Sequence, residues 1–322
     1  MSILHLNIGI DVSKDTLDVA ILSSEAKAKT FQVSNGPAGF SKLILQLKKF
    51  GASESWRITL EATSAYHRAV VMAMLDIGVK VLVLNPKQAR DLARGLGVLR
   101  KNDKTDAHVL ALCARMAWRE PEPIAQGVGF QLQEISRRIE VLSVQRSGEM
   151  KRLRNPGLST LIKESCHRQI SLLDDEIALM ERAWLETLEE SQELKRAYQN
   201  IRTVPGCGKA TSRKVVSELL AVLRDRTTAQ CVAYAGLAPH EQTSGTSIRR
   251  KSQTFSTGNK FLRTALYMGA ISSIRNDPIS KAMYTRLVEA GKPKKVAIVA
   301  VMAKLMRRIA AVVKRGTPWV NA

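Results

Sequence analysis

The chain has 322 residues, which is long enough for two domains and a connecting element. Its 50 Lys and Arg residues outnumber its 29 Asp and Glu residues, and the net charge of +21 predicts a polyanionic partner such as nucleic acid. The sequence has no long apolar run, which argues against a membrane span or a secretory signal. Its four cysteines include no Cys-x-x-Cys pair, which argues against a zinc knuckle or a disulfide framework. We therefore expect a cytoplasmic protein.

The first predicted element is a β-meander whose first strand ends in a carboxylate. Three short apolar-rich runs cover residues 4–10, 17–22 and 29–33, and turn-prone or charged residues separate them. Asp11 directly follows the first run. Because Asp is a poor strand residue, Asp11 either closes the strand or holds a divalent metal at the strand edge.

The next elements extend this meander into a mixed α/β domain. We predict an amphipathic helix at residues 39–50 and a strand at 56–60 that ends in Glu61. A second helix at 66–77, a buried strand at 79–84 and a basic stretch at 87–101 follow. A helix opened by Asp103 and Asp106 follows. Residues 1–120 are therefore interpreted as a βββαβαβα domain, a mixed sheet with helices on both faces.

Four carboxylates of this domain point to its chemistry. Asp103 and Asp106 stand three residues apart at a helix start, which puts both on one face of the first turn, where they are either helix caps or metal ligands. Together with Asp11 and Glu61 they have the layout of an RNase H-like metal site. Such a site holds two Mg²⁺ ions for in-line attack on a phosphodiester.

The middle of the chain, residues 121–196, is predicted to form a helical hairpin or coiled coil. Apolar residues repeat at alternating spacings of three and four in two series, residues 132–142 and 170–184, and an Asn-Pro-Gly sequence at 155–157 separates them. The two helices either pack only on each other or use the same seam for dimerisation.

The C-terminal part, residues 197–322, opens with a predicted helix-hairpin-helix. Its turn has the sequence Val-Pro-Gly-Cys-Gly-Lys and lies between two helical segments. The glycines let backbone N–H groups approach a phosphate, and Lys209 adds positive charge. A plain glycine-rich turn is the alternative. Two closing helices at residues 260–274 and 295–313 supply an apolar core.

A polar stretch between these helices combines hydroxyl groups with positive charge. Residues 243–247 read Thr-Ser-Gly-Thr-Ser. The segment 244–263 contains no acidic residue and five basic ones, Arg249, Arg250, Lys251, Lys260 and Arg263. A serine-rich loop beside arginines either binds phosphate passively or presents a nucleophile.

Motifs along nearly the whole chain match one known family. They are Ile10-Asp11 with Lys14, Glu61-Ala62-Thr63, Asn85-Pro86, the pair Asp103 and Asp106, Pro205-Gly206-Cys207-Gly208, Ala235-Gly236-Leu237-Ala238-Pro239, Ser244-Gly245 and Arg263-Thr264-Ala265-Leu266-Tyr267-Met268. With these motifs the chain resembles the DEDD transposases of bridge-RNA-guided insertion sequences. The resemblance is strong at both ends, whereas in the middle only the helical pattern matches.

This resemblance implies a fold and a reaction. The fold is α/β plus mainly α, with a RuvC-like domain, a central coiled coil and a helical transposase domain. The metal ligands for Mg²⁺ are implied to be Asp11, Glu61, Asp103 and Asp106. A serine of the transposase domain attacks DNA and becomes joined to it, and its motif position is that of Ser244. Ser247 and Ser252 are weaker candidates for this role.

The same resemblance implies partners. Members of the family act on donor and target DNA, are guided by a structured non-coding RNA, and work as homodimers that assemble into tetramers. We therefore expect an RNA-guided DNA recombinase that binds nucleic acid through Lys209 and the five basic residues of the polar stretch.

Two other functions fit parts of the sequence. A RuvC-like Holliday-junction endonuclease would use water with the same carboxylates, and it leaves the serine loop and the basic C-terminal part unexplained. A non-catalytic DNA- or RNA-binding protein accounts for the net charge of +21 and leaves the four positioned carboxylates unexplained. A trapped protein–DNA adduct would separate the three functions.

Overall fold

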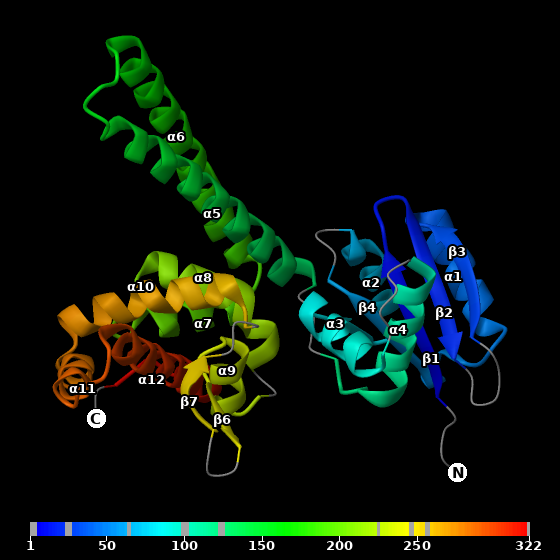
Figure 1. Ribbon diagram of the computed structural model, residues 1–322. Helices are drawn as coiled ribbons and strands as arrows, with labels where there is room; N and C mark the ends of the chain where they lie inside the picture. Colours follow the sequence, from blue (N-terminus) through cyan, green and yellow to red (C-terminus); the bar gives the residue numbers. More distant parts are fainter. Residues whose placement is uncertain are drawn as a thin grey trace. The chain divides into compact units, whose positions relative to one another are not determined.

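A five-stranded mixed sheet organises the N-terminal part of the chain in the computed structural model (Figure 1). Its order is β3-β2-β1-β4-β5, in which β1, β2 and β3 pair antiparallel and β4 pairs parallel with both β1 and β5. The predicted mixed sheet is therefore confirmed. The strands are β1 (Leu6–Val12), β2 (Thr16–Leu22), β3 (Lys29–Ser34), β4 (Trp56–Glu61) and β5 (Val81–Leu84).

The structure describes residues 5–22, 28–62, 66–97, 103–121, 126–223, 226–244, 248–254 and 258–320. Within these ranges only the backbone is described at residues 103–104, 220–223, 239–244 and 248–254. The chain divides into two compact units, Met1–Glu122 and Pro123–Ala322.

The helices of the first unit are α1 (Pro37–Lys48), α2 (His67–Asp76), α3 (Pro86–Gly95) and α4 (Asp103–Met116), with a 3-10 turn at Ser53–Ser55. The predicted order of elements omitted α3, because the basic composition of residues 87–101 concealed a helix. Two local signals start it: Pro86 occupies the first helical position, and the Asn85 side chain accepts a hydrogen bond from the backbone N–H of Lys87 at 2.9 Å.

Helix α4 covers one face of the sheet and packs on β1, β2 and β4. Gly9 of β1 makes this packing possible, because a Cβ atom added there would lie 2.1 Å from the carbonyl oxygen of Ala107. The neighbouring residues Ile8 and Ile10 point to the opposite face and are fully buried, so that face is covered as well.

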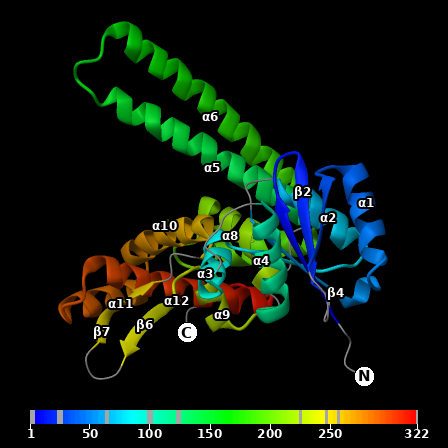
Figure 2. The same ribbon diagram turned by 45° about the vertical axis from the view of Figure 1, so that its right-hand side comes forward.

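In its described residues the second unit is helical apart from one two-stranded antiparallel ribbon. Helices α5 and α6 lie side by side as a helical hairpin (Figures 1 and 2). No described helix of the chain has the length and apolar content needed to cross a membrane. The elements are α5 (Gly127–Leu153), α6 (Thr160–Glu189), α7 (Gln192–Arg202), α8 (Lys209–Leu223), α9 (Thr228–Tyr234), β6 (Pro239–Ser244), β7 (Ile248–Thr254), α10 (Lys260–Asn276), α11 (Pro278–Glu289) and α12 (Lys294–Arg315).

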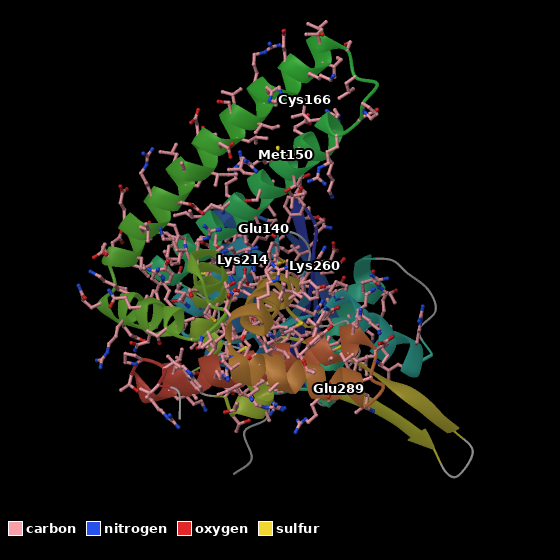
Figure 3. All side chains as sticks on the ribbon, turned by 90° about the vertical axis from the view of Figure 1, so that its left-hand side faces the viewer. Glu140, Met150, Cys166, Lys214, Lys260 and Glu289 are labelled. Atoms are coloured by element: carbon pink, nitrogen blue, oxygen red, sulfur yellow. The ribbon has the colours of Figure 1, made fainter. Side chains whose placement is uncertain are left out.

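The base of the helical hairpin belongs to the core of the second unit. Leu132 of α5 and Trp184 of α6 are buried in the same apolar cluster as residues of α8, α10 and α12. An ion pair between Glu140 of α5 and Lys214 of α8 adds a polar link, and Figure 3 shows the two side chains together. The far part of the hairpin, which carries Met150 and Cys166, extends away from this core (Figure 3).

All four cysteines, Cys113, Cys166, Cys207 and Cys231, are buried free thiols. Burial raises the pKa of Cys113 to about 11 and that of Cys207 to about 12. Such thiols are protonated near neutral pH and are poor nucleophiles, because the thiolate is the reactive form. The cysteines therefore serve as small apolar packing residues.

Candidate active site

Asp11 and Glu61 lie on neighbouring parallel strands at the same end of the sheet. The register pairs Ile10 of β1 with Leu60 of β4, so Asp11 and Glu61 are the next residues along the two strands and share one face. That face is the one covered by α4, because Gly9, two residues before Asp11, contacts α4. Both carboxylate residues are partly exposed.

The start of α4 lies against the same region of the sheet. A Cβ atom added at Gly9 would lie 2.1 Å from the Ala107 carbonyl oxygen and 2.2 Å from the Ala111 nitrogen. Asp106 directly precedes Ala107 and is partly exposed, and Asp103 begins the helix one turn earlier. The first half of α4 therefore packs on β1 two residues before Asp11, an arrangement that is consistent with a RuvC-like domain.

The metal ligands themselves are only partly described. The side chain of Asp103 lies outside the described residues. Among the described side chains, no group of three or more His, Cys, Asp and Glu residues is gathered closely enough to hold a metal ion. The chemistry of the donor set nevertheless fits Mg²⁺, since carboxylate oxygens at a strand end are hard ligands of the kind this ion prefers.

A fifth acidic residue, which the sequence analysis missed, lies next to Asp11. Asp18 of β2 pairs directly with Asp11 across the antiparallel strands, so both side chains point to the same face. Asp18 is only 8% exposed, and its Oδ2 accepts a hydrogen bond of 2.9 Å from the side-chain amide of Gln32. An acidic residue between Leu17 and Val19, in a run that is otherwise apolar, was the signal that could have identified it.

Helix α3 adds positive charge beside the sheet end that carries these carboxylates. It begins two residues after Leu84, whose register partner on β4 is Glu61. Lys87, Arg90 and Arg94 all lie exposed on this helix. Exposed cations of this kind suit a phosphate, because positive charge attracts it.

Ser244 lies at the end of β6 in the second unit. It pairs with Ile248, while Thr243 and Gln242 pair with Arg249 and Arg250 of β7. The β6–β7 element is called the serine ribbon below, and Figure 3 shows it projecting from the helices of its unit. Ser252 and Lys251 lie on β7, and Ser247 lies outside the described residues. The carboxylates and Ser244 thus belong to different compact units.

The predicted helix-hairpin-helix turn uses its two glycines differently. Gly206 has a φ of +94°, and a Cβ atom there would lie 2.4 Å from the carbonyl oxygen of Gly269 in α10. Gly206 is therefore needed for the packing of the turn on α10. Gly208 meets no atom within 4 Å, and Lys209 is exposed at the first position of α8.

The basic residues of α10 also differ in their surroundings. Lys260 is exposed at the start of the helix. Arg263 is partly buried, and its Nη1 donates to the backbone carbonyl oxygens of Ala235 at 3.4 Å and Gly258 at 3.3 Å. Arg263, which the sequence predicts to contact nucleic acid, therefore also has internal partners in both segments that flank the serine ribbon.

Known proteins match the chain across both units. Residues 8–158 match the family of DEDD transposases of IS110 type, described as "Transposase", and residues 198–285 match the "Transposase IS116/IS110/IS902 family". A pilin gene-inverting protein of Moraxella lacunata is 31% identical over 324 residues, which cover 97% of each chain. Its counterpart in Moraxella bovis is 30% identical with the same coverage. An insertion element IS110 protein of Streptomyces coelicolor is 30% identical over 121 residues, 36% of this chain and 29% of that protein. The chain therefore belongs to the IS110-type DEDD transposases, and it is a DNA transposase or recombinase.

Proposed function

We propose that this transposase cleaves and exchanges DNA strands with Ser244 as the nucleophile, that Asp11, Glu61, Asp103 and Asp106 hold Mg²⁺, and that a structured guide RNA selects the DNA sites. The observation that carries the proposal is the meeting of β1, β4 and the start of α4 at Gly9. Asp11 and Glu61 follow the paired residues Ile10 and Leu60 at one end of the sheet. Asp106 directly precedes Ala107, which packs on Gly9, and Asp103 begins the same helix one turn earlier, so this arrangement supports the proposal.

The chemistry can be written for the chain's own groups. The Ser244 hydroxyl oxygen forms a bond to phosphorus, and the bond from phosphorus to one deoxyribose oxygen breaks. The serine proton passes to a nearby base or to water, and the departing deoxyribose oxygen takes up a proton. In the second step a deoxyribose hydroxyl of another strand attacks the phosphoserine and frees the serine. When Mg²⁺ is bound it supplies positive charge against the scissile phosphate.

The partners follow from charge and from the family. Helix α3, which begins two residues after the register partner of Glu61, carries the exposed Lys87, Arg90 and Arg94, and Lys209 lies exposed in the second unit. These residues suit the phosphates of donor and target DNA and of the guide RNA. The relatives are named for inverting a pilin gene, and an inversion is itself a site-specific strand exchange. We place the protein in the cytoplasm, with the nucleoid.

The helical hairpin suits self-association. Val144 of α5 is 64% exposed, and Leu161 and Leu172 of α6 are 69% and 61% exposed. Apolar side chains on the outside of two packed helices gain from burial against a second copy. We propose that homodimers form through these outer faces and assemble into tetramers on DNA.

A second candidate is a metal-dependent endonuclease that uses water. The observation that favours it is the division of the chain, since the four carboxylates and Ser244 lie in different compact units. Hydrolysis by the first unit needs no serine, because metal-bound carboxylates alone can activate water. It would leave free DNA ends and no protein–DNA bond.

The test separates the two candidates on a denaturing gel. Labelled DNA is incubated with guide RNA, Mg²⁺ and the wild type or Ser244→Ala, with Ser247→Ala and Ser252→Ala as matched controls. We expect a protein-bound DNA band in the wild type and both controls and none in Ser244→Ala. Cleaved free ends without an adduct in every lane would establish the endonuclease, and loss in Ser247→Ala or Ser252→Ala alone would move the nucleophile.

A further inference from the structure

The two chain segments that carry the serine ribbon are fastened to each other at its stem, defined here as residues 234–238 and 258–263. The backbone N–H of Asn259 donates to the carbonyl oxygen of Tyr234 at 3.1 Å. A Cβ atom added at Gly258 would lie 2.3 Å from the nitrogen of Gly236, so the two backbones are in contact. Arg263 bridges both segments through the two carbonyl oxygens described above.

Glu218 of α8 is hydrogen-bonded to this stem through Asn259. Its Oε2 accepts a hydrogen bond of 2.9 Å from the Asn259 side-chain amide and another of 3.2 Å from Gln133. Arg137 of α5 donates to both carboxylate oxygens, at 2.8 and 3.0 Å. The Glu218 side chain is only 2% exposed. Burial of a carboxylate carries a large desolvation penalty, which the surrounding hydrogen-bond donors offset.

The orientation of the Asn259 amide is fixed from two sides. Its Oδ1 accepts the backbone N–H of Leu262 at 3.0 Å, which caps the start of α10. Its Nδ2 is therefore the atom directed at Glu218. Asn259 thus joins the cap of α10, the stem of the serine ribbon and the buried carboxylate in one residue.

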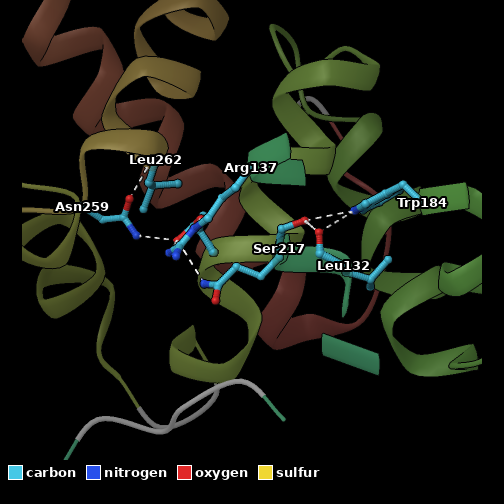
Figure 4. Close-up of polar contacts among 8 residues, drawn as sticks. Leu132, Arg137, Trp184, Ser217, Asn259 and Leu262 are labelled. Carbon is cyan, nitrogen blue, oxygen red and sulfur yellow. Dashed lines mark hydrogen bonds and ion pairs between the residues drawn. The ribbon is translucent and has the colours of Figure 1, made fainter. Parts of the chain in front are cut away.

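The same part of α8 is bonded to both arms of the helical hairpin. Ser217 precedes Glu218, and its hydroxyl donates to the carbonyl oxygen of Leu132 in α5 at 3.1 Å. The indole N–H of Trp184 in α6 donates to the Ser217 hydroxyl at 3.1 Å and to the Leu132 carbonyl at 3.2 Å. Figure 4 shows these contacts beside the Glu218 contacts, so the stem and the base of the hairpin share one polar network.

We propose that Glu218 is a positioning residue for strand cleavage, which holds the stem of the serine ribbon through Asn259 and ties it to the helical hairpin through Arg137. A two-stranded ribbon gains little stability from its own strands, so its direction depends on its stem. A nucleophile displaced by about 1 Å loses roughly 10²-fold in rate, so a loosened stem slows cleavage. The inference rests on the proposed role of Ser244.

The experiment removes one hydrogen bond and then restores it with reversed polarity. Asn259→Ser keeps an oxygen to cap α10 and loses the donor to Glu218. Asn259→Asp sets a carboxylate against Glu218, and the double variant Glu218→Gln with Asn259→Asp restores a donor and an acceptor. Asn276→Ser, an exposed position whose side-chain amide bonds only to Ser272 in the described structure, is the matched control.

The measured quantities are the rate of adduct formation at saturating DNA, the DNA concentration at half saturation, and the unfolding midpoint. We expect Asn259→Ser and Asn259→Asp to lower the saturating rate tenfold or more with half saturation within twofold of the wild type. The double variant regains at least threefold over Asn259→Asp, and Asn276→Ser matches the wild type.

Each outcome decides between the two proposals. If Asn259→Ser forms adduct within twofold of the wild-type rate, Glu218 does not position the ribbon. If that variant fails to fold, the double variant decides, because a rate no higher than that of Asn259→Asp would overturn the inference. A wild type that forms no adduct in the presence of cleaved DNA would instead overturn the role of Ser244.

Discussion

Replacing Gly9 by Ala should separate helix α4 from the sheet and disable the candidate metal site. The new Cβ atom would lie 2.1 Å from the Ala107 carbonyl oxygen, and ordinary contact begins at 3.4 Å, so the two elements must move apart by about 1.3 Å. Backbone atoms of a helix cannot turn aside as a side chain can. Overpacking of this kind costs about 1–3 kcal/mol of the free energy of unfolding.

The functional effect should exceed the loss of stability. Moving α4 carries Asp103 and Asp106 away from Asp11, and a misplacement of about 1 Å costs roughly 10²-fold in rate. We therefore expect Gly9→Ala to cleave DNA about 10²-fold more slowly than the wild type at a temperature where both are folded. The assay is a cleavage time course with guide RNA and Mg²⁺, together with denaturant unfolding.

Gly148→Ala is the matched control for this variant. Gly148 lies within α5 and a Cβ atom there would meet nothing within 4 Å, so alanine should stabilise the helix by about 0.5–1 kcal/mol and leave cleavage unchanged. A Gly9→Ala protein with wild-type cleavage and an unchanged unfolding midpoint would refute the close packing of α4 on β1 and the site built upon it.

Three further predictions test other parts of the chain. Neutral variants of the carboxylates should abolish cleavage and leave the circular dichroism spectrum unchanged; they are Asp11→Asn, Glu61→Gln, Asp103→Asn and Asp106→Asn. Recombination by these variants at near wild-type rates would show that the metal-site assignment is wrong. The charges of β7 are reversed in the triple variant Arg249→Glu, Arg250→Glu and Lys251→Glu. This variant should bind all nucleic-acid sequences more weakly, and its affinity should depend less steeply on salt concentration in a titration. Each lost phosphate contact should lower the slope of log affinity against log salt concentration by about one. Arg308→Met should cost about 3–5 kcal/mol of unfolding free energy, because it leaves the buried Asp277 carboxylate without the charged partner that contacts it at 2.7 Å. Burial alone would raise the pKa of Asp277, but hydrogen bonds from Ser280 and Arg308 outweigh burial and lower that pKa. The ionised Asp277 carboxylate should therefore stabilise the fold fully above its ordinary pKa near 3.9, and this stabilisation should disappear as the pH falls through the lower pKa of the folded state. An equal acid sensitivity of the wild type and Arg308→Met would contradict this.

The sheet and its strand-end carboxylates could be predicted because they depend on local patterns. The apolar residues of β1, which carries Asp11, and of β4, which ends at Glu61, follow a pattern typical of buried strands. The prediction ended the first strand before Asp11, whereas β1 continues through Asp11 to Val12. Asp18 could not be placed in the same way. Its position next to Asp11 depends on the register of an antiparallel pair, and that register is set by a turn whose geometry the composition does not reveal.

Other features depend on contacts between distant segments. Gly206 and Gly208 look alike in the sequence, and only the proximity of Gly269 shows that the first is needed for packing. Arg263 was predicted only as a nucleic-acid contact, because the sequence does not reveal that its Nη1 also donates to the carbonyl oxygens of Ala235 and Gly258. The serine ribbon was likewise predicted only as a polar stretch, since its strands are short and rich in residues that do not favour β structure.

Because all four cysteines are buried, the surface of the native chain presents almost no reactive thiol. Because the thiols are shielded, and Cys113 and Cys207 also have raised pKa values, alkylating reagents should react slowly until the fold opens. A cysteine introduced at an exposed position, such as Leu45 on α1, would then react first. The molecule can therefore carry a single fluorophore or cross-linker without removal of its own cysteines, and the movement of its parts during strand exchange can be followed directly.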